Sequence, residues 1–159
     1  MGLKSFLRGF KHAFRGIFEV FKNERNFRVQ ILALLWTIIL VYTAEGTRAE
    51  YFAVLICSSV VLAAECMNSA LERLCDRVTK KEDEFIRRAK DCAAAGVLIA
   101  AAGSGAVAVV MFLSEEFLVR FCAGISEKPY CGVLLVLIPV CAAIAAVFHK
   151  KAPDEKPED

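Results

Sequence analysis

Three carboxylates and an amide lie on one face of a helix that the sequence predicts to enter a membrane. Glu65, Asn68, Glu72 and Asp76 follow the stretch 51–64, which carries no formal charge. At 100° per residue the four side chains fall within an arc of about 80°. Ionised groups cost about 2.5 kcal/mol or more at mid-membrane, so they usually face a bundle interior or an aqueous cleft. We therefore expect this face to do chemistry, with Glu65 as its deepest group.

A less specific interpretation stays open for the shallower acids. Glu72 and Asp76 would lie at the level of the lipid headgroups, where they could simply form ion pairs with the nearby arginines Arg73, Arg77 and Arg88.

The charged segment after this face suits phosphate and a divalent cation. Cations such as Lys90 suit phosphate oxygens, while carboxylates such as Glu24 and Glu72 suit Mg²⁺, which proteins often hold together with substrate phosphates. Glu65 would then reach a hydroxyl group at the lipid surface. This combination favours phosphoryl transfer to a lipid alcohol.

The elements that must position these residues are membrane helices. The 159 residues are 57% hydrophobic with a mean hydropathy of +0.51, too apolar for an ordinary soluble domain. Residues 92–113 form the clearest span, since they carry no charge and about 20 apolar residues cross a membrane. The stretches 29–44 and 51–71 are two more spans, and 129–148, interrupted by Pro139, is a fourth. We expect an all-α polytopic bundle.

Charge distribution predicts the orientation of the chain. Seventeen of the twenty Lys and Arg residues fall on one side if there are four spans, and cytoplasmic loops keep positive charge. We therefore expect the N-terminus and the tail 149–159, which we expect to be disordered, to be cytoplasmic. Cys122 and Cys131 would lie on the outer side, where they could pair.

The N-terminal segment 3–28 is predicted to be an amphipathic helix on the membrane surface. Its phenylalanines recur every three or four residues, and its basic residues lie on the other side. The helix is either an anchor or one wall of an entry for lipid. Further along, Thr79 and Glu82 have capping-box spacing, so we expect the helix that contains the span 92–113 to begin there.

Taken together, the motifs resemble those of the prokaryotic diacylglycerol kinase and undecaprenol kinase family. The sequences NERNFR, ECMNSALERLCDR and RAKDCAAAGVLIAA carry the likeness, which covers residues 5–113. Membership implies a homotrimer in the bacterial cytoplasmic membrane, with three spans per subunit and a surface helix. It implies a lipid kinase that uses MgATP, with a lipid bilayer and no nucleic acid as partner.

The resemblance also implies roles for individual residues. Glu65 matches the general base, with Asn68 beside it, and Glu24 and Glu72 match the carboxylates that hold the ATP-bound metal. The positions matching nucleotide contacts are His12, Lys81, Glu82, Asp83, Lys90 and Asp91. Asp76 matches an acidic position that we expect to be structural.

The chain departs from the family at its C-terminus. Residues 1–113 correspond to the kinase domain, whereas 114–148 add a loop and the fourth span. The acceptor is either diacylglycerol or undecaprenol, and the sequence leaves open whether active sites are shared between subunits. A non-enzymatic transporter or proton relay is the competing hypothesis, because carboxylates within spans also serve such proteins.

Overall fold

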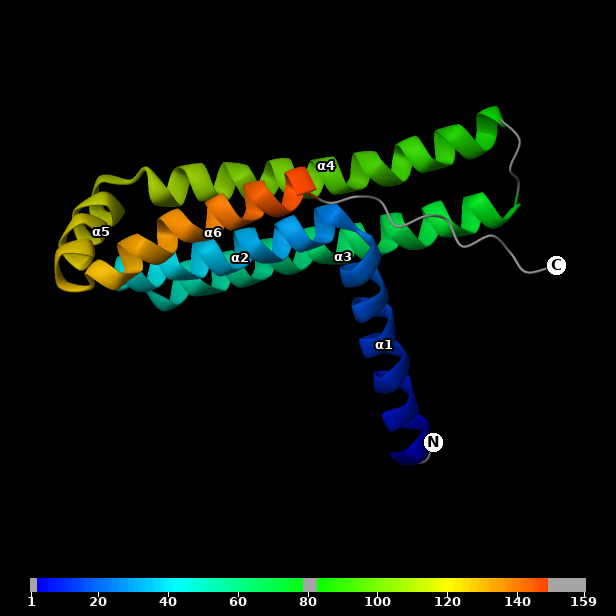
Figure 1. Cartoon of the computed structure of the whole chain (residues 1–159), viewed down its shortest axis with the longest axis horizontal. Helices are drawn as coiled ribbons and strands as arrows, with labels where there is room; N and C mark the ends of the chain where they lie inside the picture. The colour runs from blue at the N-terminus through cyan, green and yellow to red at the C-terminus, as the bar shows by residue number, and fades with distance from the viewer. Residues whose placement is uncertain (1–2, 79–82, 149–159) are drawn as a thin grey trace.

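The polypeptide forms a bundle of helices with a further helix at each end. The computed structural model describes residues 3–78 and 83–148, with side chains from 8 to 78 and from 83 to 141. Within those ranges the elements are α1 (Leu3–Asn23), α2 (Arg25–Thr43), α3 (Arg48–Val78), α4 (Glu84–Phe112), α5 (Glu115–Glu127) and α6 (Pro129–Phe148). Figure 1 shows α6, α2, α3 and α4 side by side, with α1 projecting from the start of α2, part-way along α3 and α4, and α5 at the opposite end of the bundle. The predicted all-α membrane bundle is confirmed.

Among the described residues, three helices, α2, α3 and α4, are long and apolar enough to cross a membrane. The bent pair α5 and α6, whose axes differ by 107°, makes a fourth span if the pair is counted as one. With 31 and 29 residues, α3 and α4 are about 46 and 44 Å long at 1.5 Å per residue. A hydrocarbon core is about 30 Å thick, so both helices reach well beyond it. In Figure 1 they extend past α2 at the end from which α1 projects.

The surface helix ends earlier than the sequence predicts. Instead of continuing to residue 28, α1 stops at Asn23 because Glu24 adopts an extended conformation, with φ −100° and ψ 116°. Arg25 then starts α2 in a new direction (Figure 1). The phenylalanines described on α1, among them Phe10, Phe14 and Phe18, are exposed, as expected for a helix whose apolar side rests on lipid.

A tight turn joins α2 to α3. Glu45 has a positive φ of 51°, and Gly46 donates its backbone N–H to the carbonyl of Val41. A Cβ atom on Gly46 would lie 2.2 Å from a Val41 methyl group, so only glycine fits there. The start of α3 is a capping box: Glu50 accepts hydrogen bonds from the backbone N–H and hydroxyl of Thr47, and the Thr47 oxygen accepts from the Glu50 N–H.

The segment after α4, predicted to be a loop, contains helix α5. The Ser114 hydroxyl oxygen caps it by accepting from the N–H of Phe117, and the Phe117 ring is 2% exposed. That ring lies 5.0 Å from Phe112 between centroids and belongs to an apolar cluster with Val41 and Val54. The prediction of a loop was wrong because the charges of α5 obscured an apolar face that packs on α2 and α4.

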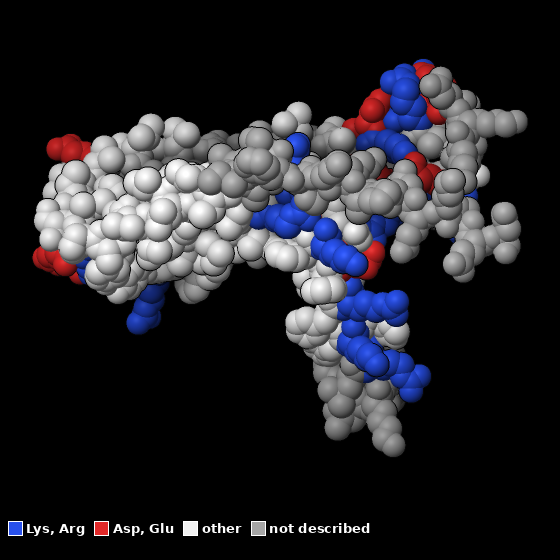
Figure 2. Space-filling model, viewed as in Figure 1, with Lys and Arg blue, Asp and Glu red and all other residues white. Residues whose placement is uncertain are grey.

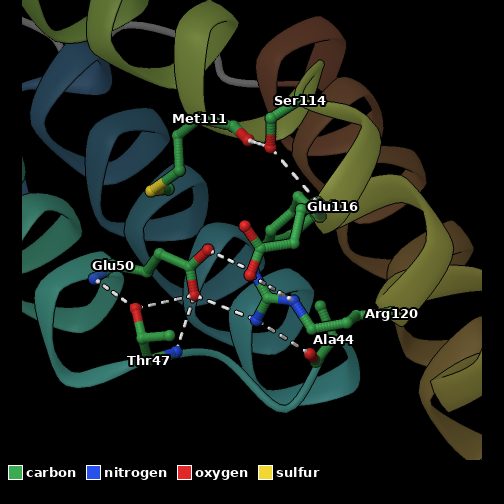
Figure 3. Close-up of polar contacts among 8 residues, drawn as sticks. Ala44, Thr47, Glu50, Met111, Ser114, Glu116 and Arg120 are labelled. Atoms are coloured by element: carbon green, nitrogen blue, oxygen red, sulfur yellow. Dashed lines mark hydrogen bonds and ion pairs between the residues drawn. The ribbon is translucent and has the colours of Figure 1, made fainter.

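An ion pair fixes α5 to the turn between α2 and α3. Arg120 donates to both carboxylate oxygens of Glu50, at 2.6 and 3.3 Å, and to the carbonyl of Ala44 at 3.3 Å (Figure 3). At Gly124 the backbone of α5 comes so close that a Cβ atom would lie 1.7 Å from the carbonyl oxygen of Thr43. Together, the ion pair and this close approach make α5 an integral part of the bundle.

Helix α6 packs along α2. The indole N–H of Trp36 donates to the carbonyl oxygen of Leu135 over 2.9 Å. Pro139 lies inside α6, four residues after Leu135, and proline has no N–H for the helical bond to that carbonyl. Trp36 therefore satisfies the acceptor that Pro139 leaves without its helical donor. Cys122 and Cys131, which could have paired, are both free thiols.

Candidate active site

The carboxylate of Glu65 is buried between α2 and α3. Its side chain belongs to the same buried stripe of α3 as Val61 and Ser69, and Glu65 is only 3% exposed. Gln30 on α2 donates from Nε2 to Glu65 Oε2 over 3.3 Å. The structure thus places the deepest acid of the polar face where the sequence predicts it, inside the bundle and away from lipid.

Asn68 and Glu72 form the next level of the same face. The Asn68 amide nitrogen donates to Glu72 Oε1 over 2.8 Å. The amide oxygen of Asn68 therefore points away from Glu72. That oxygen is buried without a hydrogen-bond partner, as are the Gln30 Oε1 oxygen and the Ser69 hydroxyl. Because buried polar groups normally have partners, three such atoms around Glu65 indicate a place for a polar ligand or water.

Glu24 reaches this region from the break between α1 and α2. Its carboxylate lies 3.7 Å from the guanidinium of Arg73, which also pairs with Glu19 on α1 at 3.5 Å. Since Arg73 follows Glu72 directly, the ion pair brings Glu24 to the stretch of α3 that carries the polar face. Among the residues with described positions, no three or more acids, histidines or cysteines form a ready metal cage.

Lys90 faces α3 from the charged start of α4. It pairs with Asp76, and an opposite charge beside an ammonium group favours its charged form. Lys90 therefore stays positively charged at neutral pH. Asp76 does form an ion pair, as the less specific interpretation expects, but its partner is Lys90 and not an arginine. Glu72 likewise bonds to Asn68 rather than to an arginine in the contacts described.

The other described positions expected to contact nucleotide lie near the start of α4 or on α1. Asp91 pairs with Arg87 at 3.1 Å, and both side chains are well exposed. His12 is exposed in the middle of α1, which projects from the bundle (Figure 1). Lys81 and Glu82 lie outside the described residues.

The predicted start of α4 needs correction. The helix begins at Glu84 rather than at the Thr79–Glu82 pair, and its N-cap is Asp83, whose carboxylate accepts from the N–H groups of Phe85 and Ile86. Asp83 thus has a structural task in this conformation, because it satisfies N–H groups that the helix leaves unpaired.

Gln30 and Ser69 are candidate site residues that sequence reasoning missed. Gln30 is the only amide in the otherwise apolar run 29–44, and an isolated amide in a span is a usable signal for a polar partner. Ser69 gave no such signal, because serine is common where membrane helices pack closely.

An apolar groove leads away from the site along the bundle. It has a volume of about 280 Å³ and lies among α2, α3 and α4, with Gln30 near one end and Met111 and Phe112 near the other. Two of its hydroxyls bond to backbone carbonyls: Thr37 to Ala33 and Leu34, and Ser104 to Ala100 and Cys57. The groove is therefore a hydrocarbon-lined surface that starts beside the buried carboxylate.

Comparison with known proteins decides the family. The model of the prokaryotic diacylglycerol kinase family matches residues 11–112, the part of the chain that contains every described candidate residue. The chain belongs to this family. It is therefore a membrane-embedded lipid kinase, as the resemblance predicts.

Individual relatives support the same assignment. Undecaprenol kinase of Bacillus subtilis is 31% identical over 113 residues, covering 71% of this chain and 92% of the relative. Diacylglycerol kinase of Haemophilus influenzae is 32% identical over 99 residues, covering 62% and 84%. Diacylglycerol kinase of a Synechocystis species is 36% identical over 100 residues, covering 60% and 55%. No solved structure matches the chain significantly.

Proposed function

We propose that this lipid kinase transfers the γ-phosphoryl group of MgATP to the hydroxyl of a membrane lipid alcohol. The candidate acceptors are undecaprenol and diacylglycerol, the lipids that appear in the names of its relatives. The observation that carries the proposal is the buried Glu65 carboxylate, held by Gln30 at the junction between the uncharged and charged parts of α3. A lipid hydroxyl and a water-soluble phosphoryl donor can meet only at such a junction.

Glu65 acts as the general base. It accepts the hydroxyl proton while the hydroxyl oxygen bonds to the γ-phosphorus, and the bond from that phosphorus to the bridging oxygen breaks to release ADP. The hydrogen bond from Gln30 orients the carboxylate, since a base must lie within hydrogen-bond reach of the proton it takes. Lys90 exchanges its bond to Asp76 for a phosphate oxygen and offsets charge there.

The polar groups beside Glu65 fit a hard divalent cation. Glu24 and Glu72 offer carboxylates, and the buried amide oxygen of Asn68 has no other partner. Two or three oxygen ligands suffice where phosphates and water supply the rest, as is usual for Mg²⁺. The cation would neutralise charge on the β- and γ-phosphate oxygens. We therefore assign the Asn68 amide oxygen as a metal ligand, in addition to its expected place beside the acceptor hydroxyl.

The orientation follows from the distribution of charge. Figure 2 shows most of the blue and red surface on α1 and at the α1 end of the bundle, whereas the rest of the bundle is mainly white. Positive charge favours the cytoplasmic side, so α1 and the site face the cytoplasm of a bacterial cell. In this arrangement α6 is the fourth span and brings the chain back to that side. The functional unit is a homotrimer, as the family resemblance implies.

Phosphate transfer tests this proposal. Purified protein in mixed micelles receives ATP labelled at the γ-phosphate, with diacylglycerol and undecaprenol offered in parallel, with Mg²⁺ or with a chelator. We expect label in at least one lipid, dependent on Mg²⁺. Label in neither lipid from folded protein would refute the proposed reaction, and label that survives chelation would refute the role given to the metal ligands.

A further inference from the structure

A guanidinium group ties α1 to α3. Arg73 on α3 faces two carboxylates with its terminal nitrogens: Nη1 lies 3.5 Å from Glu19 Oε1, and Nη2 lies 3.7 Å from Glu24 Oε1. Glu19 is held in turn by Asn23, whose amide nitrogen donates to the same Glu19 oxygen over 2.7 Å. Because α1 otherwise projects away from the bundle (Figure 1), this bridge fixes how its last turn meets α3.

The Glu24 carboxylate has no local bond that would hold it in place. Glu24 is the residue before α2, where a side chain often caps the helix by accepting from its first N–H groups. Asp83 and Ser114 do so for α4 and α5, whereas the described side chain of Glu24 makes no such bond. The contact that directs its carboxylate is the one with Arg73.

The contact leaves Glu24 able to bind a cation. The ion pair with Arg73 uses the Oε1 oxygen, so the second oxygen can face a metal. Mg²⁺ demands near-ideal ligand geometry, and groups that hold a ligand in place strengthen metal binding. Resting on the proposed function, in which Glu24 and Glu72 bind the metal, we infer that Arg73 is a positioning residue. It holds the Glu24 carboxylate near Glu72 so that both can bind one divalent cation.

This role needs a guanidinium group and not merely a positive charge. The nitrogens of Arg73 span two carboxylates, whereas the ammonium group of a lysine is a single point charge. Exposed ion pairs contribute little to stability, and the side chains of Arg73 and Glu19 are 42% and 52% exposed. Loss of Arg73 should therefore change metal binding much more than the stability of the fold.

Binding of Mn²⁺, a paramagnetic substitute for Mg²⁺, tests the inference without turnover. Full-length protein in micelles is titrated with the complex of Mn²⁺ and a non-hydrolysable ATP analogue, and the relaxation of water protons reports binding. Arg73→Met should weaken binding by about 10- to 100-fold, and Arg73→Lys should recover only part of the loss. Arg48→Met, which removes an exposed cation at the opposite end of α3, should bind as the wild type does.

Hydrogen exchange and kinetics give two further readouts. In Arg73→Met protein the amides of residues 18–26, which cover the last turn of α1 and the break after it, should exchange faster than in the wild type. In lipid labelling the KM for MgATP should rise while kcat stays near the wild-type value, because the variant loses binding and not a group that reacts.

The outcomes separate this inference from the proposed function. Weaker binding, a raised KM and an unchanged melting temperature support the inference. Unchanged or tighter binding by Arg73→Met protein would overturn it, as would full recovery by Arg73→Lys or a fall in kcat alone. If Arg73→Met does not fold, Arg73→Lys, which keeps the charge, decides by the same readouts. Binding that Glu24→Gln leaves intact would instead overturn the metal site of the proposed function, and the role of Arg73 with it.

Discussion

The indole N–H of Trp36 on α2 donates to the carbonyl oxygen of Leu135 on α6, 99 positions later in the chain. This carbonyl is the one that Pro139 leaves without a helical donor. Membrane helices tolerate proline where a neighbouring helix satisfies the freed carbonyl. The pair therefore fixes the register of α6 against α2 and gives the helix beyond the family-matched region a defined place.

Replacing Trp36 tests this contact through a double-mutant cycle. Trp36→Phe keeps an aromatic ring but removes the donor, and should lower the free energy of unfolding by about 1 kcal/mol, a usual value for hydrogen bonds between membrane helices. In a Pro139→Ala background residue 139 supplies its own N–H to Leu135, so the part of the loss due to the hydrogen bond should disappear. Unfolding in micelles gives the coupling between the two sites.

The fluorescence of Trp36 provides an independent check on the same contact. The chain contains one tryptophan, so its emission reports this indole alone. Pro139→Ala should shift the emission as the bond to Leu135 weakens. Equal destabilisation by Trp36→Phe in both backgrounds, with no spectral shift, would contradict the account.

Arg120 is expected to be essential for the packing of α5. Arg120→Met should destabilise the protein by about 2–4 kcal/mol, because it leaves the largely buried Glu50 carboxylate without its ion pair. The matched control is Arg48→Met, which removes an exposed cation at the start of α3 and should change stability little. Thermal unfolding measured by circular dichroism compares the stability of the two variants. Equal stability would argue against the Arg120–Glu50 ion pair as the contact that holds α5 in place.

Gln30 is predicted to position the general base. Gln30→Met keeps similar length without a donor, so kcat should fall by about tenfold as the Glu65 carboxylate loses its orientation. The KM for ATP should stay near the wild-type value, because Gln30 bonds to Glu65 and not to the nucleotide residues. Thr43→Val, at the other end of α2, whose hydroxyl bonds within its own helix, should leave kcat unchanged. A change confined to the KM for ATP would place Gln30 elsewhere in the mechanism.

Lys90 and Asp76 should differ in their importance for catalysis. Lys90→Met removes the cation assigned to a phosphate oxygen, and kcat/KM for ATP should fall by about 10²–10³. Asp76→Asn removes only its partner, so the loss should stay below about tenfold. Steady-state kinetics with varied ATP separates the effects. A larger loss for Asp76→Asn would indicate that the carboxylate acts directly.

Short-range patterns in the sequence were sufficient to predict the polar face, whereas distant partners were not. Glu65, Asn68 and Glu72 share a face because helical geometry alone determines it. Gln30 bonds to a residue 35 positions away, and Trp36 to one 99 positions away, so neither contact follows from local spacing. Only tertiary packing reveals such pairs.

Element boundaries failed where a single residue or a packed face decides them. The extended conformation of Glu24 ends α1, yet NERNF contains no proline or glycine to signal it. For α5, the Ser114 cap was a usable signal, but four acidic and basic positions concealed the apolar face that buries Phe117. The roles assigned to the site residues, from His12 to Asp91, stay predictions.

The most direct test of the central claim is phosphate transfer by Glu65→Gln protein. Glutamine keeps the size of the side chain but cannot accept the hydroxyl proton, so the rate of lipid labelling from γ-labelled ATP should fall by about 10²–10⁴. Glu116→Gln, at the far end of the bundle, should retain the wild-type rate. Mg²⁺-dependent labelling that survives undiminished in folded Glu65→Gln protein would contradict the role of this buried carboxylate as the base.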